Sequence, residues 1–226
     1  SRHFPLRNQM PTSQQQLQQR RASSALAVTS LTILFLWVYG RFALDLYFVM
    51  DDFIHAADEM TRPLWDTLRD AFAGAISWSG YRPLATAMRV LMFHAFGMER
   101  MWAYYVVYLA LHLVNTLLTF RIARRAGAAV PWAFFVAAIV LLLPSHNEAV
   151  FWFAANSNLL ALFFCLLALD FALSSLRTGA LPAQLAATAA YVCAVLAYEV
   201  TIALPVLIFF AGWILTGRSI RRHMRL

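Results

Sequence analysis

The sequence predicts an all-α protein: a polytopic membrane bundle of about six transmembrane helices, with interfacial amphipathic helices in a long first outer loop. Of its 226 residues, 62% are hydrophobic and only 13% are charged, about half the charged fraction of an ordinary soluble domain. The apolar residues are gathered into long runs, as in membrane-spanning helices. All 18 basic residues are Arg, clustered mostly between these runs, which indicates topology signals and membrane lipid as a partner, and no nucleic acid.

Six apolar runs are predicted to cross the membrane within a transmembrane region over residues 25–216. Several runs are shorter than the ~20 residues of an ideal span, which implies little tilt or a locally thinned bilayer. Residues 1–24 are polar and rich in Gln and are predicted to form a flexible cytoplasmic tail. Residues 217–226 are predicted to form a second, basic tail. The predicted spans are residues 25–49, 102–120, 130–143, 158–173, 182–197 and 201–215.

The distribution of charge gives an orientation. Twelve arginines precede the first run or follow the second, fourth and sixth runs, so both termini are expected in the cytoplasm, of a bacterial inner membrane. Five more lie in the outer loop and count against this orientation. Most of the 11 acidic residues then fall on or near the outer face, which suggests a site there: Asp51, Asp52, Asp58, Glu59, Asp66, Asp70, Glu99, Glu148 and Glu199.

The first outer loop, about residues 50–101, is rich in Trp, Leu and Phe, so it is expected to fold. Pro63 can open a helix, and Leu64, Trp65, Leu68 and Phe72 would share one face of it. A second helix begins near residue 81, with Leu84, Met88, Leu91 and Met92 on one side and Arg82 and Arg89 off that stripe. Such helices lie in the membrane interface; the alternative is that they merely cap the bundle.

Asp51 and Asp52 stand side by side where the first run ends. Two adjacent carboxylates repel each other and favour no packing role, so both are expected near water. They can hold a divalent cation such as Mg²⁺ or Mn²⁺, or one of them can take a proton from a hydroxyl. The alternative is simple solvated charge at a helix end. His55 is close enough in sequence to assist a metal, although a solvated His is the favoured interpretation.

Three further polar groups need partners inside or near the membrane. Glu199 begins the sixth run, and an ionisable group at that depth requires a partner, for which Arg82 and His146 are the candidates. His112 and Asn115 are three residues apart on one helix face. Interhelical hydrogen bonds are the favoured role for this pair, with ligand binding as the alternative.

The motifs, taken in order, resemble the integral-membrane GT-C glycosyltransferases. The resemblance is to the branch of transmembrane O-mannosyltransferases that carry TPR repeats and to their bacterial relatives, over residues 45–205, as an amino-terminal membrane module. The motifs are Asp51-Asp52, Tyr81-Arg-Pro-Leu84, Leu111-His-Leu-Val-Asn115, Pro144-Ser-His-Asn-Glu-Ala-Val-Phe-Trp152, Asn156-Ser-Asn-Leu-Leu160 and Tyr198-Glu-Val-Thr-Ile-Ala-Leu-Pro205.

The resemblance implies transfer of a sugar from a polyprenyl-phosphate donor on the non-cytoplasmic face. Asp51 or Asp52 would act as base or metal ligand. Arg82 would pair with the lipid phosphate. His146 and Glu148 would lie beside the site, and Glu199 would complete the binding set.

This chain departs from the family pattern in two ways. Tyr198 stands where the family usually has Lys, and family members continue with further spans after the sixth. The alternative function is therefore a non-catalytic accessory or assembly subunit of a larger membrane complex, respiratory or photosynthetic. A small transporter is the least favoured class, because neither broken helices nor inverted repeats are evident.

Overall fold

The computed structural model describes residues 13–42, 48–49, 51–75, 80–143, 147–210 and 213. Within these residues every regular element is a helix. Three helices are long and apolar enough to cross a bilayer: α1 (Ser13–Tyr39), α5 (Met101–Arg125) and α8 (Asn156–Thr178). The described part of the chain is therefore helical, and its three long apolar helices indicate an integral membrane protein, as the composition predicted.

Three more apolar helices coincide with predicted spans but are shorter: α6 (Val130–Leu142), α9 (Leu181–Ala197) and the stretch Glu199–Phe210, which begins as the 3₁₀ helix η3 (Glu199–Ala203). Each predicted span thus corresponds to a helix. The largest difference is at the start, because α1 begins at Ser13 and ends at Tyr39. Residues 13–24 of the predicted tail are therefore helical, and the first helix ends ten residues before the predicted limit at residue 49.

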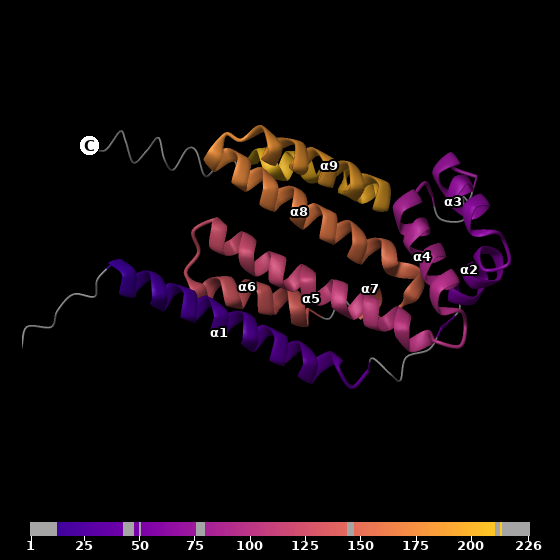
Figure 1. The fold of residues 1–226 in the computed structure, drawn as a ribbon, viewed down its shortest axis with the longest axis horizontal. Coiled ribbons are helices and arrows are strands. Elements are labelled where there is room, and N and C mark those ends of the chain that lie inside the picture. The colour runs from indigo at the N-terminus through magenta and orange to yellow at the C-terminus, as the bar shows by residue number, and fades with distance from the viewer. Residues whose placement is uncertain are drawn as a thin grey trace, which may run out of the picture.

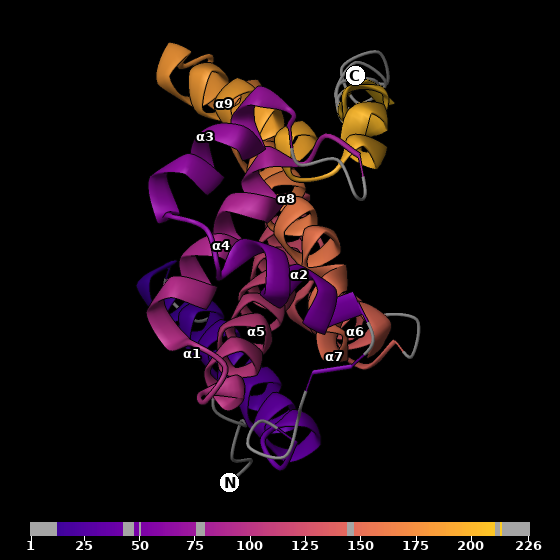
Figure 2. The same ribbon diagram turned by 90° about the vertical axis from the view of Figure 1, so that its right-hand side faces the viewer.

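The long helices lie side by side along the long axis of the molecule (Figure 1). α5 packs between α6 and α8, α1 lies against α6, and α9 lies against α8. Three short helices cover one end of this bundle (Figures 1 and 2): α2 (Asp51–Glu59), α3 (Leu64–Ala73) and α4 (Pro83–Phe96). We call α2–α4 the outer cap, after the side on which the predicted topology places these helices. The described part of the predicted first outer loop is thus mostly helical, as its composition predicted.

The two longer cap helices use their apolar residues differently. On α3, Trp65 and Phe72 are exposed, whereas Thr67 and Ala71 are buried, so the apolar stripe of α3 faces away from the protein, as expected of an interfacial helix. On α4 the buried face contains Arg89 together with Val90 and Phe93. The prediction that α4 is a second interfacial helix of the same kind is therefore wrong, because α4 is the central helix of the cap.

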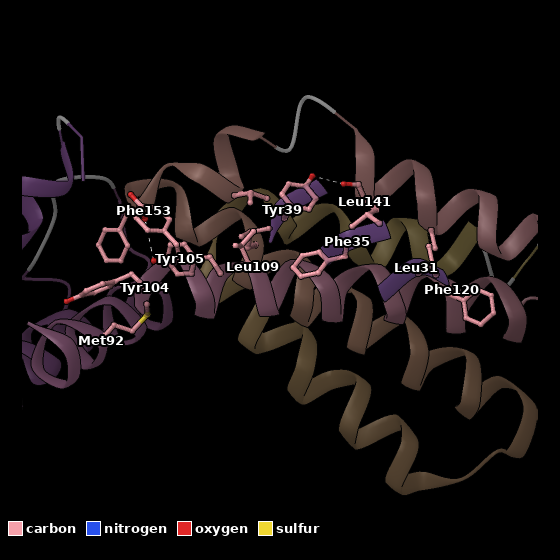
Figure 3. Packing of buried hydrophobic residues seen from close by; sticks show 14 of the residues in the cluster. Leu31, Phe35, Tyr39, Met92, Tyr104, Tyr105, Leu109, Phe120, Leu141 and Phe153 are labelled. Carbon is pink, nitrogen blue, oxygen red and sulfur yellow. Dashed lines mark hydrogen bonds between the residues drawn. The ribbon is translucent and has the colours of Figure 1, made fainter. Parts of the chain in front are cut away.

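An aromatic cluster joins the outer cap to the bundle. The ring of Phe153 lies 5.0 Å from that of Phe48, 5.1 Å from that of Tyr104 and 5.2 Å from that of Phe93, measured between centroids. These spacings are typical of favourable tilted and edge-to-face aromatic pairs. Figure 3 shows Tyr104 and Phe153 at the cap end of the buried cluster. Phe153 belongs to the short 3₁₀ helix η2 (Phe153–Ala155), so this turn is held against both parts of the molecule.

Buried polar side chains connect the bundle helices. The Tyr39 hydroxyl donates to the Leu141 carbonyl at 2.7 Å (Figure 3), and His112 Nε2 lies 3.2 Å from the same oxygen. Asn115 Nδ2 donates to the Leu159 carbonyl at 3.0 Å. The predicted interhelical role of His112 and Asn115 is confirmed, and it is favoured because hydrocarbon offers polar groups no other partners.

An ionic contact ties α5 to α8 at the end opposite the cap. Asp170 is 2% exposed. Its carboxylate oxygens lie 3.1 Å from Arg121 Nη2 and 2.9 Å from Arg125 Nη1. The two arginines are one helical turn apart and so face α8 together. Away from these contacts the bundle presents large apolar side chains outward, including Trp37 and Trp132, as a lipid-facing surface requires.

Candidate functional site

Asp52 is buried, and each of its two carboxylate oxygens accepts a hydrogen bond from a backbone N–H. It lies in the first turn of α2 with 0% exposure. Its Oδ2 accepts the N–H of Val49 at 2.9 Å, and its Oδ1 accepts the N–H of Ala154 at 2.8 Å. Burial raises the pKa of Asp52, while these two hydrogen bonds oppose the shift. The expectation that both carboxylates lie near water without a packing role is wrong for Asp52, which anchors the start of α2 to η2.

Asp51 differs from its neighbour because it is exposed. It is therefore the accessible carboxylate of the pair. The described residues bring together no group of three His, Cys, Asp or Glu side chains that could hold a metal. A Mg²⁺ or Mn²⁺ ion there would take a carboxylate oxygen from Asp51 and its remaining ligands from water or substrate, which is a common arrangement for Mg²⁺.

A buried ion pair joins α2 to α4. Arg89 Nε donates to both carboxylate oxygens of Glu59, at 2.8 and 3.0 Å, and Arg89 Nη2 donates to Oε1 as well. The side chains are 5% and 1% exposed. Burial raises the pKa of Glu59, and the hydrogen bonds from Arg89 oppose that shift. The sequence analysis did not predict this pair. The usable signal was Arg89, a cation that lies off the apolar stripe of a helix rich in small residues.

His55 lies beside the same pair, with Nδ1 3.7 Å from Glu59 Oε1. Burial, reinforced by the nearby Arg89 cation, lowers the pKa of His55 to about 4. His55 is therefore neutral at neutral pH, and its contact with Glu59 is not an ion pair under those conditions. This corrects the favoured interpretation of His55 as a solvated residue.

An open ion pair links the start of α4 to the segment after α9. Arg82 Nε donates to Glu199 Oε2 at 2.9 Å, and Arg82 Nη2 donates to Oε1 at 2.7 Å. Arg82 Cζ lies 4.1 Å from the centroid of the Tyr198 ring. Hydrogen bonding from Arg82 lowers the pKa of Glu199. Of the two partners predicted for Glu199, the described one is Arg82. The ring of Tyr198 thus lies against the same guanidinium.

The predicted site residues whose side chains are described fall into two groups: Asp51 and Asp52 at the start of α2, and Arg82 paired with Glu199. Arg82 immediately precedes α4, and Arg89 lies two turns later on the same face, about 10 Å further along the axis. Arg89 is the cation whose charge acts on Asp52, whereas Arg82 is paired with Glu199. Glu148 lies in α7 (Asn147–Phe151), but its side chain, like His146, lies outside the described part of the structure.

Two open grooves lie elsewhere in the bundle. One, of about 590 Å³, runs between α1 and α6, and the other, of about 400 Å³, runs between α8, α9 and the helix that follows. Their linings are mainly apolar, as expected where lipid chains pack. Of the predicted site residues whose side chains are described, none lines either groove.

Comparison of the chain with known protein families, with curated proteins and with solved structures finds no match.

Proposed function

We propose that this protein is a GT-C-like membrane glycosyltransferase, or its membrane module, that moves a sugar from a polyprenyl-phosphate donor on the non-cytoplasmic face. The observation that carries the proposal is the pairing of distant motif segments at the cap. Asp52 bonds to Ala154, just after the motif at 144–152, and Arg82 bonds to Glu199. Three of the segments that carry the resemblance, 51–52, 81–84 and 198–205, therefore make these contacts at one end of the bundle.

The proposed chemistry is an inverting displacement. The Asp51 carboxylate takes the proton of an acceptor hydroxyl, and that oxygen forms a bond to the anomeric carbon. The bond from the anomeric carbon to the phosphate oxygen breaks, and the lipid phosphate leaves with the electron pair. Arg82 stabilises the charge that develops on the phosphate. A Mg²⁺ or Mn²⁺ ion, when bound, would neutralise further phosphate charge. Asp52 positions α2 through its two backbone hydrogen bonds, and so positions Asp51.

The carboxylate assignment is tested by Asp51→Asn, with Asp66→Asn as the matched control, because Asp66 is also an exposed acid of the outer cap. Both variants should fold. Asp51→Asn should lower transfer by about 10²–10⁴-fold, as expected for loss of a general base, and Asp66→Asn should leave it unchanged. The assay follows transfer from a panel of polyprenyl-phosphate sugars in proteoliposomes. Full turnover in Asp51→Asn overturns the assignment.

We also propose six membrane crossings, with both termini in the cytoplasm of a bacterial inner membrane. In support, successive bundle helices alternate in direction (Figure 1), and α5 and α8 both run from the cap toward a basic last turn, with Arg124 and Arg125 in α5 and Arg177 in α8. The test uses Thr61→Cys and Thr178→Cys, two exposed positions, in a background lacking Cys165 and Cys193. An impermeant maleimide should label Thr61→Cys in intact cells and Thr178→Cys only after permeabilisation. Labelling of both from one side refutes this topology.

The alternative function, an accessory or assembly subunit of a respiratory or photosynthetic membrane complex, has its own support. Asp52, Arg89 and Arg82 all have partners within the chain, as in a structural framework. The exposed Trp65 and Phe72 of α3 offer a surface to a partner. This function predicts a stoichiometric partner after purification in a mild detergent and no turnover with any polyprenyl-phosphate sugar. Turnover that depends on Asp51 excludes it.

A further inference from the structure

We propose that the Glu199 carboxylate occupies the anion-binding position of Arg82. The phosphate of a polyprenyl-phosphate carrier displaces it from that position. Tyr198 is the platform that keeps the guanidinium in place during the exchange. This inference rests on the proposed function, because it assigns the donor phosphate to a defined position in the outer cap and adds a built-in competitor for it.

The geometry of the pair suits an exchange of anions. Arg82 uses Nε and Nη2 to bind both oxygens of Glu199, at 2.9 and 2.7 Å. A phosphate group presents two oxygens to a guanidinium in the same forked arrangement as a carboxylate. The two nitrogens of Arg82 that bind Glu199 can therefore bind a phosphate without any rearrangement of Arg82.

The exposure of the pair makes Glu199 easy to displace. Its side chain is 57% exposed, and that of Arg82 is 21% exposed. Exposed ion pairs are weak because water competes for both partners, so Glu199 can return to water at little cost. It also begins η3, a short 3₁₀ helix with no buried residue, in which hydrogen-bond geometry is poorer than in an α-helix.

Gly80 lies next to the Glu199 carboxylate. It has a φ of +92°, a conformation that favours glycine, and a Cβ built on it would lie 3.8 Å from Glu199 Oε1, at ordinary van der Waals distance. Backbone without a side chain therefore borders the carboxylate at this point.

Tyr198 explains how Arg82 keeps its position when Glu199 leaves. The ring lies 4.1 Å from Arg82 Cζ, within the range of a cation–π interaction, which does not depend on the carboxylate. A second cation at this position would repel Arg82, whereas an aromatic ring holds it. The replacement of the family's Lys by Tyr198 is therefore consistent with a site in which one arginine exchanges its anion.

The test measures binding of a short-chain polyprenyl monophosphate to the full chain in detergent micelles. Glu199→Gln removes the competing charge and should tighten binding by about fivefold, the largest gain expected from releasing an exposed ion pair. Arg82→Gln should abolish the phosphate-dependent part of binding. Asp70→Asn is the matched control, because it removes the carboxylate of another part-exposed pair of the cap, Arg62–Asp70, and should change nothing.

Additional ligands and Tyr198 variants identify the anion that binds and test the role of the Tyr198 ring. The matching polyprenol, which lacks phosphate, should bind equally to wild type and Glu199→Gln. Inorganic phosphate should compete only weakly; competition as strong as that of the lipid would overturn the lipid source. Tyr198→Phe should preserve binding and Tyr198→Leu should weaken it. Unchanged or weaker binding in Glu199→Gln, with the variant shown to be folded by circular dichroism, overturns the proposal.

The experiments distinguish failure of the anion exchange at Arg82 from failure of the proposed transferase function. Tighter binding in Glu199→Gln without turnover by any variant would keep the exchange at Arg82 and reject the transferase. Turnover that depends on Asp51, together with unchanged binding in Glu199→Gln, would keep the transferase and reject the exchange.

Discussion

Arg82 immediately precedes α4 and Arg89 lies seven residues later within it, and each binds a glutamate through two nitrogens. The Arg89–Glu59 pair is 5% and 1% exposed, whereas the Arg82–Glu199 pair is 21% and 57% exposed. In the buried pair neither charge can reach water, so loss of one partner strands the other. In the open pair water can replace either partner at small cost. Burial therefore gives one pair a structural role in the cap and leaves the other free to exchange ligands.

The largest effect on stability is expected from breaking the buried pair. Arg89→Gln leaves Glu59 as an uncompensated buried carboxylate, which typically costs about 3–5 kcal/mol. Equilibrium unfolding in mixed detergent micelles should report this loss. The double variant Arg89→Met with Glu59→Leu should recover most of it, because the buried charges are then both removed. A loss below about 1 kcal/mol for Arg89→Gln, the range of surface pairs, would contradict the structural role of this pair.

The second effect is a pH dependence of stability that arises from His55. Its pKa falls from 6.5 to about 4 in the folded protein, so the unfolded state binds more protons between these values. The contribution of His55 to the free energy of unfolding is therefore fully present above about pH 6.5. It is lost as the pH falls toward 4, by about 3 kcal/mol at most. The groups that act on His55 are Asp51, Asp58, Glu59 and Arg89.

His55→Gln isolates this contribution. The raised pKa values of Asp52 and Glu59 act in the opposite sense, because their folded forms keep protons to higher pH, so their contribution is present at low pH and lost as the pH rises. The difference in unfolding free energy between wild type and His55→Gln should therefore vary between pH 6.5 and 4. A constant difference across that range would refute the lowered pKa of His55.

The third effect distinguishes the two adjacent aspartates. Asp52→Asn retains one acceptor oxygen for two backbone N–H donors, so one donor loses its partner, at a cost of about 1–3 kcal/mol. Asp51→Asn, at an exposed position, should leave stability unchanged. Thermal unfolding of the two variants beside wild type measures both. Equal stability of the two variants would contradict the different roles given to these carboxylates.

The smallest effect is expected at the open pair. Arg82→Gln breaks an ion pair that water screens, and it should cost no more than about 1 kcal/mol. The same unfolding assay measures it, with Asp70→Asn as a comparison at the Arg62–Asp70 pair. A cost near that of Arg89→Gln would show that Glu199 is fixed rather than displaceable.

The sequence was sufficient to predict features that depend only on neighbouring residues, such as helix positions and helix faces. Apolar runs located all six bundle helices to within a few residues at most boundaries, because hydropathy over a window depends only on neighbouring residues. The outward stripe of Trp65 and Phe72 and the inward pair His112 and Asn115 followed from helical periodicity alone. Whether α6, with 13 residues, crosses the bilayer depends on its packing and on membrane thickness, which periodicity does not contain.

The contacts of the outer cap required the fold. Asp52 receives one hydrogen bond from a residue 102 positions away, and Arg89 pairs with Glu59 across 30 positions. Composition showed that the acids crowd one face, but it could not tell which are buried. The Arg82–Glu199 pair was among the predicted options because a charge at the start of an apolar helix demands a partner. That argument does not reach Arg89 and Glu59, because Arg89 lies within α4 and Glu59 ends α2.

Double-mutant cycles on the two ion pairs test the central comparison most directly. Unfolding free energies of wild type, the two single variants and the double variant give a coupling energy for Arg89–Glu59 and, separately, for Arg82–Glu199. We predict a coupling of about 3 kcal/mol or more for the buried pair and less than about 1 kcal/mol for the open pair. Equal couplings, or a larger coupling for Arg82–Glu199, would contradict the division of the cap into a fixed and an exchangeable half.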